Sequence, residues 1–179
     1  MLPYVNIHTH RPTGSGIELR TEGVHPWDAD MRLVATLGER LSYAQAVGET
    51  GLDFVHGPSR EVQTEALRAQ LRLARERELP VVLHCVRAFE PLMRELAACE
   101  PRAVIFHGFI GSPEQARQAL AKGYFLSFGE RAFASPKTLA ALRETPLSQL
   151  FLETDDSPVP IEEIYARAAE ARSVPTEVL

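Results

Sequence analysis

The stretch Pro80-Val81-Val82-Leu83-His84-Cys85 decides the fold, because it is apolar without alternation and then reaches a histidine. A strand with a continuous apolar run is buried on both faces, as in a parallel sheet that helices cover. Residues 103–107 repeat this character, with Val104-Ile105-Phe106 directly before another histidine. Two such strands, separated by a helical pattern, predict a parallel α/β fold.

Apolar runs alternate with helical patterns along almost the whole sequence. The other strand candidates are residues 4–8, 44–49, 124–128 and 149–153, with a weaker one at 17–24. Helices are expected at 60–78, at 88–99, after Ser112-Pro113, after Ser135-Pro136 and from Ile161, and Gly123 suits a left-handed helix exit. Because only a crossover helix returns the chain to the same end of a sheet, these strands must pair in parallel.

Six polar residues lie at or just past the C-terminal ends of the expected strands. They are His8, His10, Glu49, His84, His107 and Asp155. In a closed α/β barrel the strand ends meet at one mouth, so residues about 100 positions apart can share a site. We therefore predict a TIM-type (β/α) barrel that forms a single domain over residues 1–179.

Composition limits the classes of partner and compartment. The net charge of −5 argues against a protein that coats nucleic acid through bulk positive charge, although a local cationic site can still hold phosphate. No apolar run approaches the roughly 18 residues of a membrane span, and residues 1–6 do not combine a basic segment with a long apolar one, so we expect no export leader. Cys85 and Cys99 form no Cys-x-x-Cys pair. We expect a cytoplasmic monomer without a membrane partner.

The six polar residues carry a recognisable chemistry. Four imidazoles and two carboxylates suit zinc, manganese, iron or magnesium, and they exceed what one catalytic ion usually takes. Two divalent ions bridged by Glu49 would use them all and support metal-assisted hydrolysis. Such a positive centre favours an anionic phosphodiester. Asp155 is the expected proton acceptor, and Arg87 is placed to reach a phosphate with its planar fork.

At this point the motifs resemble those of the TatD family of metal-dependent hydrolases. In chain order they are His8-Thr9-His10, Gly23-Val24-His25-Pro26-Trp27, Gly48-Glu49-Thr50-Gly51-Leu52-Asp53, Leu83-His84-Cys85, His107-Gly108-Phe109-Ile110-Gly111-Ser112 and Leu152-Glu153-Thr154-Asp155. Together they cover most of the chain, including the His-Pro-Trp and Glu-Thr-Asp-Asp-Ser motifs of a shorter subgroup.

The resemblance implies a TIM-type barrel and a metal-dependent deoxyribonuclease that attacks single-stranded DNA ends in the 3′–5′ direction. It implies two divalent ions, Mg, Mn or Zn. One would be held by His8, His10 and Asp155 and the other by His84 and His107, with Glu49 between them. His25 would line the substrate pocket. Relative to the family, the barrel is abbreviated at the first βα unit, between His10 and Gly23, and at the C-terminus.

Two alternatives to the nuclease remain open. The same dinuclear scaffold could hydrolyse an amide, ester or lactone, because many chemistries share this barrel. The chain could also be a catalytically silent metal-binding protein. Two further residues have competing interpretations. Asp53 is expected to hydrogen-bond the turn that follows its strand rather than touch substrate, and Trp27 to pack over the barrel end rather than stack on a base.

Overall fold

The structure is a computed structural model that describes residues 3–179. Its internal contacts divide the chain into two compact units. The central unit is Arg20–Phe106, and the terminal unit combines the chain before residue 20 with His107–Leu179. The single domain expected from the sequence stays a prediction.

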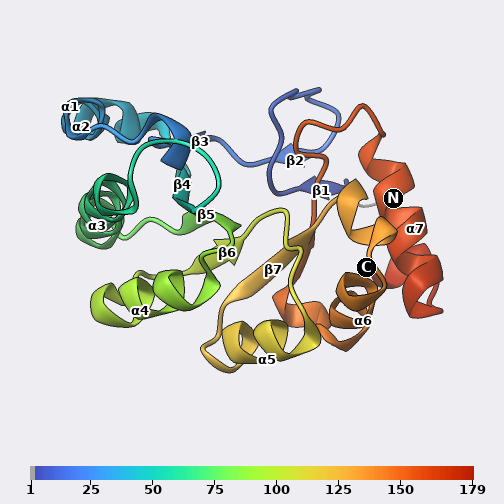
Figure 1. Ribbon diagram of the computed structural model, residues 1–179. Helices are drawn as coiled ribbons and strands as arrows, with labels where there is room; N and C mark the ends of the chain where they lie inside the picture. The colour runs from blue at the N-terminus through green and yellow to red at the C-terminus, as the bar shows by residue number, and fades with distance from the viewer. Residues whose placement is uncertain (1–2) are drawn as a thin grey trace. The chain divides into compact units, whose positions relative to one another are not determined.

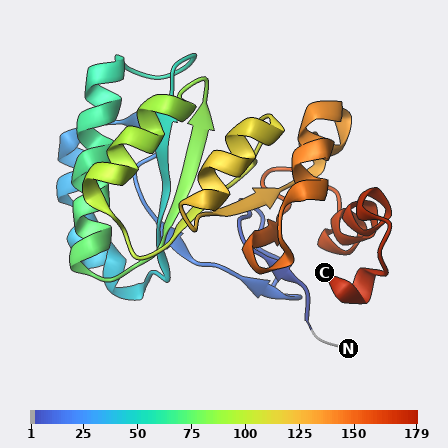
Figure 2. The same cartoon turned by 90° about the horizontal axis from the view of Figure 1, so that it is seen from below.

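The central unit is built on four parallel strands. In spatial order they are β3 (Thr21–Glu22), β4 (Ala46–Asp53), β5 (Val81–Val86) and β6 (Val104–Phe106). Helices α3 (Arg60–Glu76) and α4 (Phe89–Cys99) follow β4 and β5 and lie side by side against them (Figures 1 and 2). Val81, Val82 and Leu83 are completely buried, as a strand enclosed on both faces requires.

Four short helical segments lie between β3 and β4, where the sequence analysis placed none. They are η1 (Pro26–Asp28), α1 (Met31–Ala35), α2 (Leu37–Arg40) and η2 (Leu41–Tyr43). Each spans three to five residues, which is too short for an apolar stripe to repeat. Local side-chain caps start two of them, η1 and α1. At α1 the Asp30 carboxylate accepts a hydrogen bond from the Arg32 backbone N–H at 2.8 Å.

Strand β4 continues past residue 49, where the sequence analysis ended it. Val47 lies opposite Val81 and Thr50 opposite Leu83, so β4 carries one extra residue in this interval. Such a bulge redirects side chains and is common beside functional sites. The prediction that Glu49 lies at the strand end was wrong, because it occupies this bulge. The strand pattern ended too early because β4 contains glycine where a side chain has no room. At Gly51 a Cβ would lie 2.0 Å from the His84 carbonyl oxygen.

The terminal unit contains two pairs of parallel strands, β1 (Val5–Asn6) with β2 (Ile17–Glu18) and β7 (Phe125–Phe128) with β8 (Leu150–Leu152). The two pairs meet where the Ile7 backbone N–H donates to the Leu152 carbonyl at 3.2 Å. No helix separates β1 from β2 in the described chain, which agrees with the abbreviated first βα unit. The single strand expected at 17–24 is two strands, β2 and β3.

Three longer helices belong to the terminal unit, α5 (Pro113–Ala121), α6 (Pro136–Glu144) and α7 (Ile161–Arg172), and α6 packs against both others (Figure 1). Short segments η3 (Glu130–Ala134), η4 (Leu147–Gln149) and η5 (Thr176–Val178) complete it. Ser112 and Gln115 form the expected capping box, and Gly123 has the left-handed φ of +78°. Within residues 3–179 no helix has the length and apolar character to cross a membrane.

Candidate metal centres

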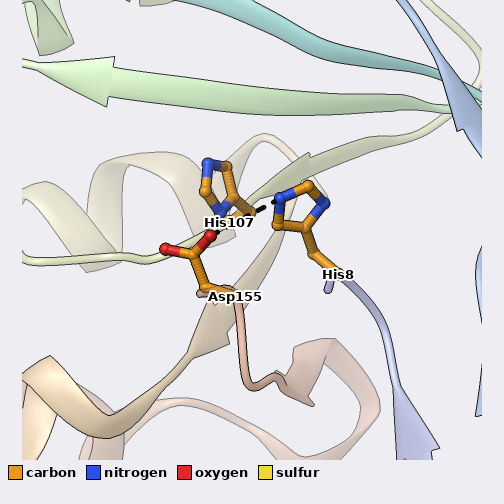
Figure 3. A group of neighbouring side chains, drawn as sticks. All are labelled: His8, His107 and Asp155. Atoms are coloured by element: carbon orange, nitrogen blue, oxygen red, sulfur yellow. Dashed lines mark ion pairs between the residues drawn. The ribbon is translucent and has the colours of Figure 1, made fainter. Parts of the chain in front are cut away.

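Three predicted ligands converge in the terminal unit: His8, His107 and Asp155 (Figure 3). Their ligand atoms all lie within 4.8 Å of one another. The Nε2 atom of His8 is 3.8 Å from Oδ1 of Asp155, and the His8 and His107 ring centroids are 4.3 Å apart. His10 approaches the same carboxylate, with its Nε2 3.4 Å from Oδ1. We call His8, His107 and Asp155 the terminal ligand group.

The backbone explains how Asp155 reaches the two histidines of the first motif. Its N–H donates to the His8 carbonyl at 3.1 Å, and its carbonyl accepts from the His10 N–H at 2.9 Å. Its φ of +53° is left-handed, so the chain turns at this position. One residue earlier, Thr154 accepts from Asn6 Nδ2 at 2.9 Å, which ties the ends of β1 and β8 together.

A residue that the sequence analysis did not assign to the site orients His107. Oε1 of Glu153 lies 3.2 Å from Nδ1 of His107 and accepts from the Gly108 N–H at 2.7 Å. Burial raises the pKa of Glu153, but the charge and hydrogen bond of His107 outweigh it and hold the pKa below its usual value. A carboxylate on Nδ1 leaves Nε2 to bind an ion. The sequence signal was an acid directly after a buried strand.

A second group of potential ligands lies in the central unit: His25, Glu49 and His84, with ligand atoms within 4.8 Å of one another. Oε1 of Glu49 is 2.7 Å from Nδ1 of His84 and 3.1 Å from Nε2 of His25. The Glu49 side chain is only 7% exposed, so this carboxylate is removed from bulk water. We call these three residues the central ligand group.

Asp53 fixes the orientation of His84 from behind. Its Oδ2 lies 3.2 Å from Nε2 of His84 and 2.6 Å from the indole Nε1 of Trp27. Its Oδ1 accepts from the backbone N–H groups of Val55 and His56. Burial raises the pKa of Asp53, but these hydrogen bonds together lower it well below the ordinary value. The expected structural role at the turn is present, together with a contact to a candidate ligand.

The donor set of the central group suits a cation. Because the ionised Asp53 accepts from Nε2 of His84, the neutral ring presents the lone pair of Nδ1 toward Glu49. That lone pair faces a carboxylate oxygen at 2.7 Å. Two acceptor atoms this close require a proton or a positive ion near both. Imidazole and carboxylate are typical ligands of a catalytic divalent ion, so the residues present match the chemistry of a metal site.

His25 lies beside Glu49 in the central ligand group. Its Nδ1 accepts from the Trp27 backbone N–H at 3.2 Å, which places the proton of the neutral ring on Nε2. That N–H points at Oε1 of Glu49. In this tautomer His25 donates a hydrogen bond and does not offer a metal ligand. Its contact with substrate stays a prediction.

The remaining predicted residues lie outside both groups. Arg87 is exposed directly after β5, with a left-handed φ of +49°, and its contact with phosphate stays a prediction. The sequence analysis expected His84 and His107 to hold one ion together. These histidines belong to different units, and their shared ion stays a prediction. Trp27 is 51% exposed, so it is only partly packed.

Comparison with known proteins identifies the family. The sequence model described as TatD related DNase matches residues 18–177. The uncharacterized metal-dependent hydrolase YjjV of Escherichia coli is 37% identical over 134 residues, which cover 73% of this chain and 52% of YjjV. The 3′-5′ ssDNA/RNA exonuclease TatD of Cronobacter sakazakii is 37% identical over 151 residues, covering 75% of this chain and 56% of that protein. The chain thus spans about half the length of these relatives.

Solved structures agree with the sequence comparison. The crystal structure of Escherichia coli YjjV, a TatD homologue, matches 90% of this chain and 71% of its own, with a TM-score of 0.78 and 27% identity. A TatD family hydrolase of Entamoeba histolytica matches 90% of this chain and 70% of its own, with a TM-score of 0.77 at 18% identity, which shows the fold alone. The predicted TIM-type barrel class is confirmed, and the chain belongs to the family of TatD-related DNases.

Proposed function

We propose that this chain is a metal-dependent hydrolase of phosphodiester bonds, a TatD-type deoxyribonuclease that acts on single-stranded DNA ends in the 3′–5′ direction. The supporting observation is a repeated arrangement. In each ligand group a buried carboxylate contacts one nitrogen of a histidine ring: Asp53 contacts His84, and Glu153 contacts His107. The other ring nitrogen is thereby directed toward the remaining ligands of the group. The names of the relatives, among them the human deoxyribonuclease TATDN3 at 33% identity, point to a nucleic acid substrate.

Two divalent ions, of Mg, Mn or Zn, complete the proposal. The terminal ligand group, with His10 beside it, would hold one, and Glu49 with His84 would hold the other. The bridging position that the sequence analysis gave Glu49 stays a prediction, and the metal content of Glu49→Gln tests it. Such ions supply Lewis acid chemistry, polarising a phosphoryl oxygen and making water more acidic.

Three residues of the chain are assigned a role in proton transfer or in binding the substrate. Asp155 keeps its carboxylate 24% exposed beside His8 and His10, so water can reach it, and we assign it the role of proton acceptor. His25 carries a hydrogen on Nε2 beside Glu49 and can donate a hydrogen bond to an anionic oxygen of the substrate. Arg87 is the proposed phosphate contact.

The oligomeric state and the cell compartment also belong to the proposed function. We propose a monomer that works in the cytoplasm. The two cysteines, Cys85 and Cys99, are free thiols, as a reducing compartment permits.

The test is cleavage of a single-stranded DNA oligonucleotide that carries a label at its 5′ end, with added Mg or Mn. The parent protein is compared with Asp155→Asn and with Asp156→Asn, which changes the adjacent exposed acid. A ladder of shortening products from the parent and Asp156→Asn, but not from Asp155→Asn, is the expected result.

Other outcomes overturn the proposal. Hydrolysis of an ester, amide or lactone by a protein that leaves DNA intact would assign a different bond. No hydrolysis of any substrate in such a panel, by folded protein that binds metal, would assign a silent metal-binding protein. Equal cleavage by Asp155→Asn would remove the proposed proton acceptor.

A further inference from the structure

An exposed aromatic surface lies next to the central ligand group. Trp27 is 51% exposed, although it is in η1 and contacts buried polar residues. Its ring centroid lies 4.9 Å from that of His25 and 6.1 Å from that of His84. His56, whose side chain is 60% exposed, lies against it with a centroid distance of 5.3 Å and an interplanar angle of 53°. About half of the Trp27 surface is therefore accessible beside the site.

The polar atoms around this surface are anchored. The indole N–H of Trp27 donates to Oδ2 of Asp53 at 2.6 Å, and Nδ1 of His56 lies 3.2 Å from the same oxygen. The Trp27 backbone N–H donates to His25. Asp53 thus holds both rings through nitrogen atoms at their edges, which fixes their orientation. A ring held in this way loses little conformational entropy when a ligand packs on it.

The loop that carries His56 is also fixed. The buried amide of Gln63 donates to the carbonyl oxygens of Asp53, His56 and Pro58, at 2.8, 2.9 and 3.0 Å. Gly57 packs against η1 so closely that a Cβ there would lie 2.8 Å from the Trp27 Cα. The two segments that carry Trp27 and His56 therefore form one rigid support within the central unit.

We propose that Trp27, with His56 beside it, is a subsite on which a nucleobase of the substrate strand stacks. The phosphate of that strand would lie at the central ligand group. This inference rests on the proposed function and adds that the protein recognises the bases of its substrate as well as the phosphates. A flat aromatic face binds any base, because every base has a π-face, so the subsite supplies affinity without sequence preference. The packing role expected for Trp27 explains its anchored edge but not its exposed surface.

The test uses the fact that Trp27 is the only tryptophan in the chain. Intrinsic tryptophan fluorescence therefore reports on this position alone. The folded protein with Mg is titrated with a short single-stranded phosphorothioate oligonucleotide, which resists cleavage, and with an abasic oligonucleotide of the same length. Stacking predicts quenching by the first and little change with the second. It also predicts that the base-bearing strand binds about tenfold more tightly.

Variants separate stacking from folding. Trp27→Leu should remove the tenfold preference for the base-bearing strand, measured by anisotropy of a dye-labelled oligonucleotide, whereas Trp27→Phe should keep most of it because an aromatic face remains. Tyr43→Leu is the matched control, since Tyr43 is an 81% exposed aromatic located before the start of β4, away from Asp53 at its other end. Its preference should equal that of the parent.

The outcomes distinguish this inference from the proposed function. Cleavage of DNA with no quenching, and equal affinity for the abasic strand, would overturn the stacking subsite and leave the nuclease standing. A protein that neither binds nor cleaves single-stranded DNA would overturn both. If Trp27→Leu does not fold, the parent titration and Trp27→Phe still decide, because loss of the preference in Trp27→Phe contradicts an aromatic subsite.

Discussion

Oδ2 of Asp53 lies 3.2 Å from Nε2 of His84, and this contact decides which ring nitrogen of His84 carries the proton. With the proton on Nε2, the lone pair of Nδ1 faces Glu49. In the terminal unit Glu153 does the same for His107 from the Nδ1 side, at 3.2 Å. Each pair sets a histidine in the tautomer and orientation that metal binding requires.

The Asp53→Asn variant tests this relationship. An amide would turn its NH₂ toward two N–H donors, those of Trp27 and His84, and would favour the His84 tautomer protonated on Nδ1. We expect metal affinity to fall by about 10–100-fold, and stability to fall by about 2–3 kcal/mol. Calorimetric metal titration and urea denaturation measure the two effects.

Asp30→Asn is the matched control for that prediction. Asp30 is also a carboxylate of the central unit, but it caps α1 at the surface, where asparagine caps equally well. Its metal affinity should match that of the parent. If Asp53→Asn binds metal as tightly as Asp30→Asn, then Asp53 does not control the tautomer of His84.

A second prediction concerns the close approach of β4 to β5. Gly51 has a φ of +143°, and a Cβ there would lie 2.0 Å from the His84 carbonyl oxygen. Gly51→Ala should therefore lower the free energy of unfolding by more than about 3 kcal/mol. Gly14→Ala is the comparison, because Gly14 also has a positive φ, +69°, but open space around it. It should cost only about 1–2 kcal/mol. Equal losses in urea denaturation would show that steric contact at Gly51 is unimportant.

A third prediction concerns pH and the loop that follows His10. The carboxylate of Glu18 accepts from the N–H groups of Thr13 and Gly14, and the Thr13 hydrogen bond is the main cause of its lowered pKa. Because the pKa of Glu18 is lower in the folded loop, its ionised form stabilises the loop at pH values above 4.5, the pKa of the unfolded chain. This stabilisation is lost as the pH falls through the lower pKa of the folded state.

Hydrogen exchange of residues 11–16, corrected for intrinsic rates, measures that effect. Protection in the parent should be present at neutral pH and decline below about pH 4.5, whereas Glu18→Gln should lack it at both pH values. Protection in Glu18→Gln equal to that of the parent would show that other contacts hold the loop.

The sequence predicted those parts of the fold whose signals are local or periodic. The apolar run at Val81 to Leu83 specified a covered parallel strand, and Ser112 with Gln115 specified a helix start that the structure contains. The helical segments between β3 and β4 were missed because each is shorter than the pattern that reveals a helix. The bulge at Glu49 was missed because it is visible only in the register of β4 against β5.

The candidate site shows the same division. The ligand types of the His-x-His and Glu-Thr-Asp motifs were readable in order, and the structure brings His8 and Asp155 together. The supporting contacts were not readable, because Asp53 meets Trp27 across 26 positions and Glu153 meets His107 across 46. Nothing local in the sequence encodes such pairs. The tautomer of His25 could not be predicted for the same reason, since it depends on a backbone contact of η1.

The last prediction concerns metal content. The terminal and central ligand groups are made of different residues, so a variant in one group should lose the ion that this group holds. Asp155→Asn should reduce the bound metal from two ions to one, and so should Glu49→Gln, whereas the double variant should bind none. Elemental analysis after desalting measures the ratio. Metal at 100 times its Kd should raise parent stability by about 2.7 kcal/mol for each site, and chelation should remove that gain. Loss of both ions in Glu49→Gln alone would instead favour a bridging carboxylate.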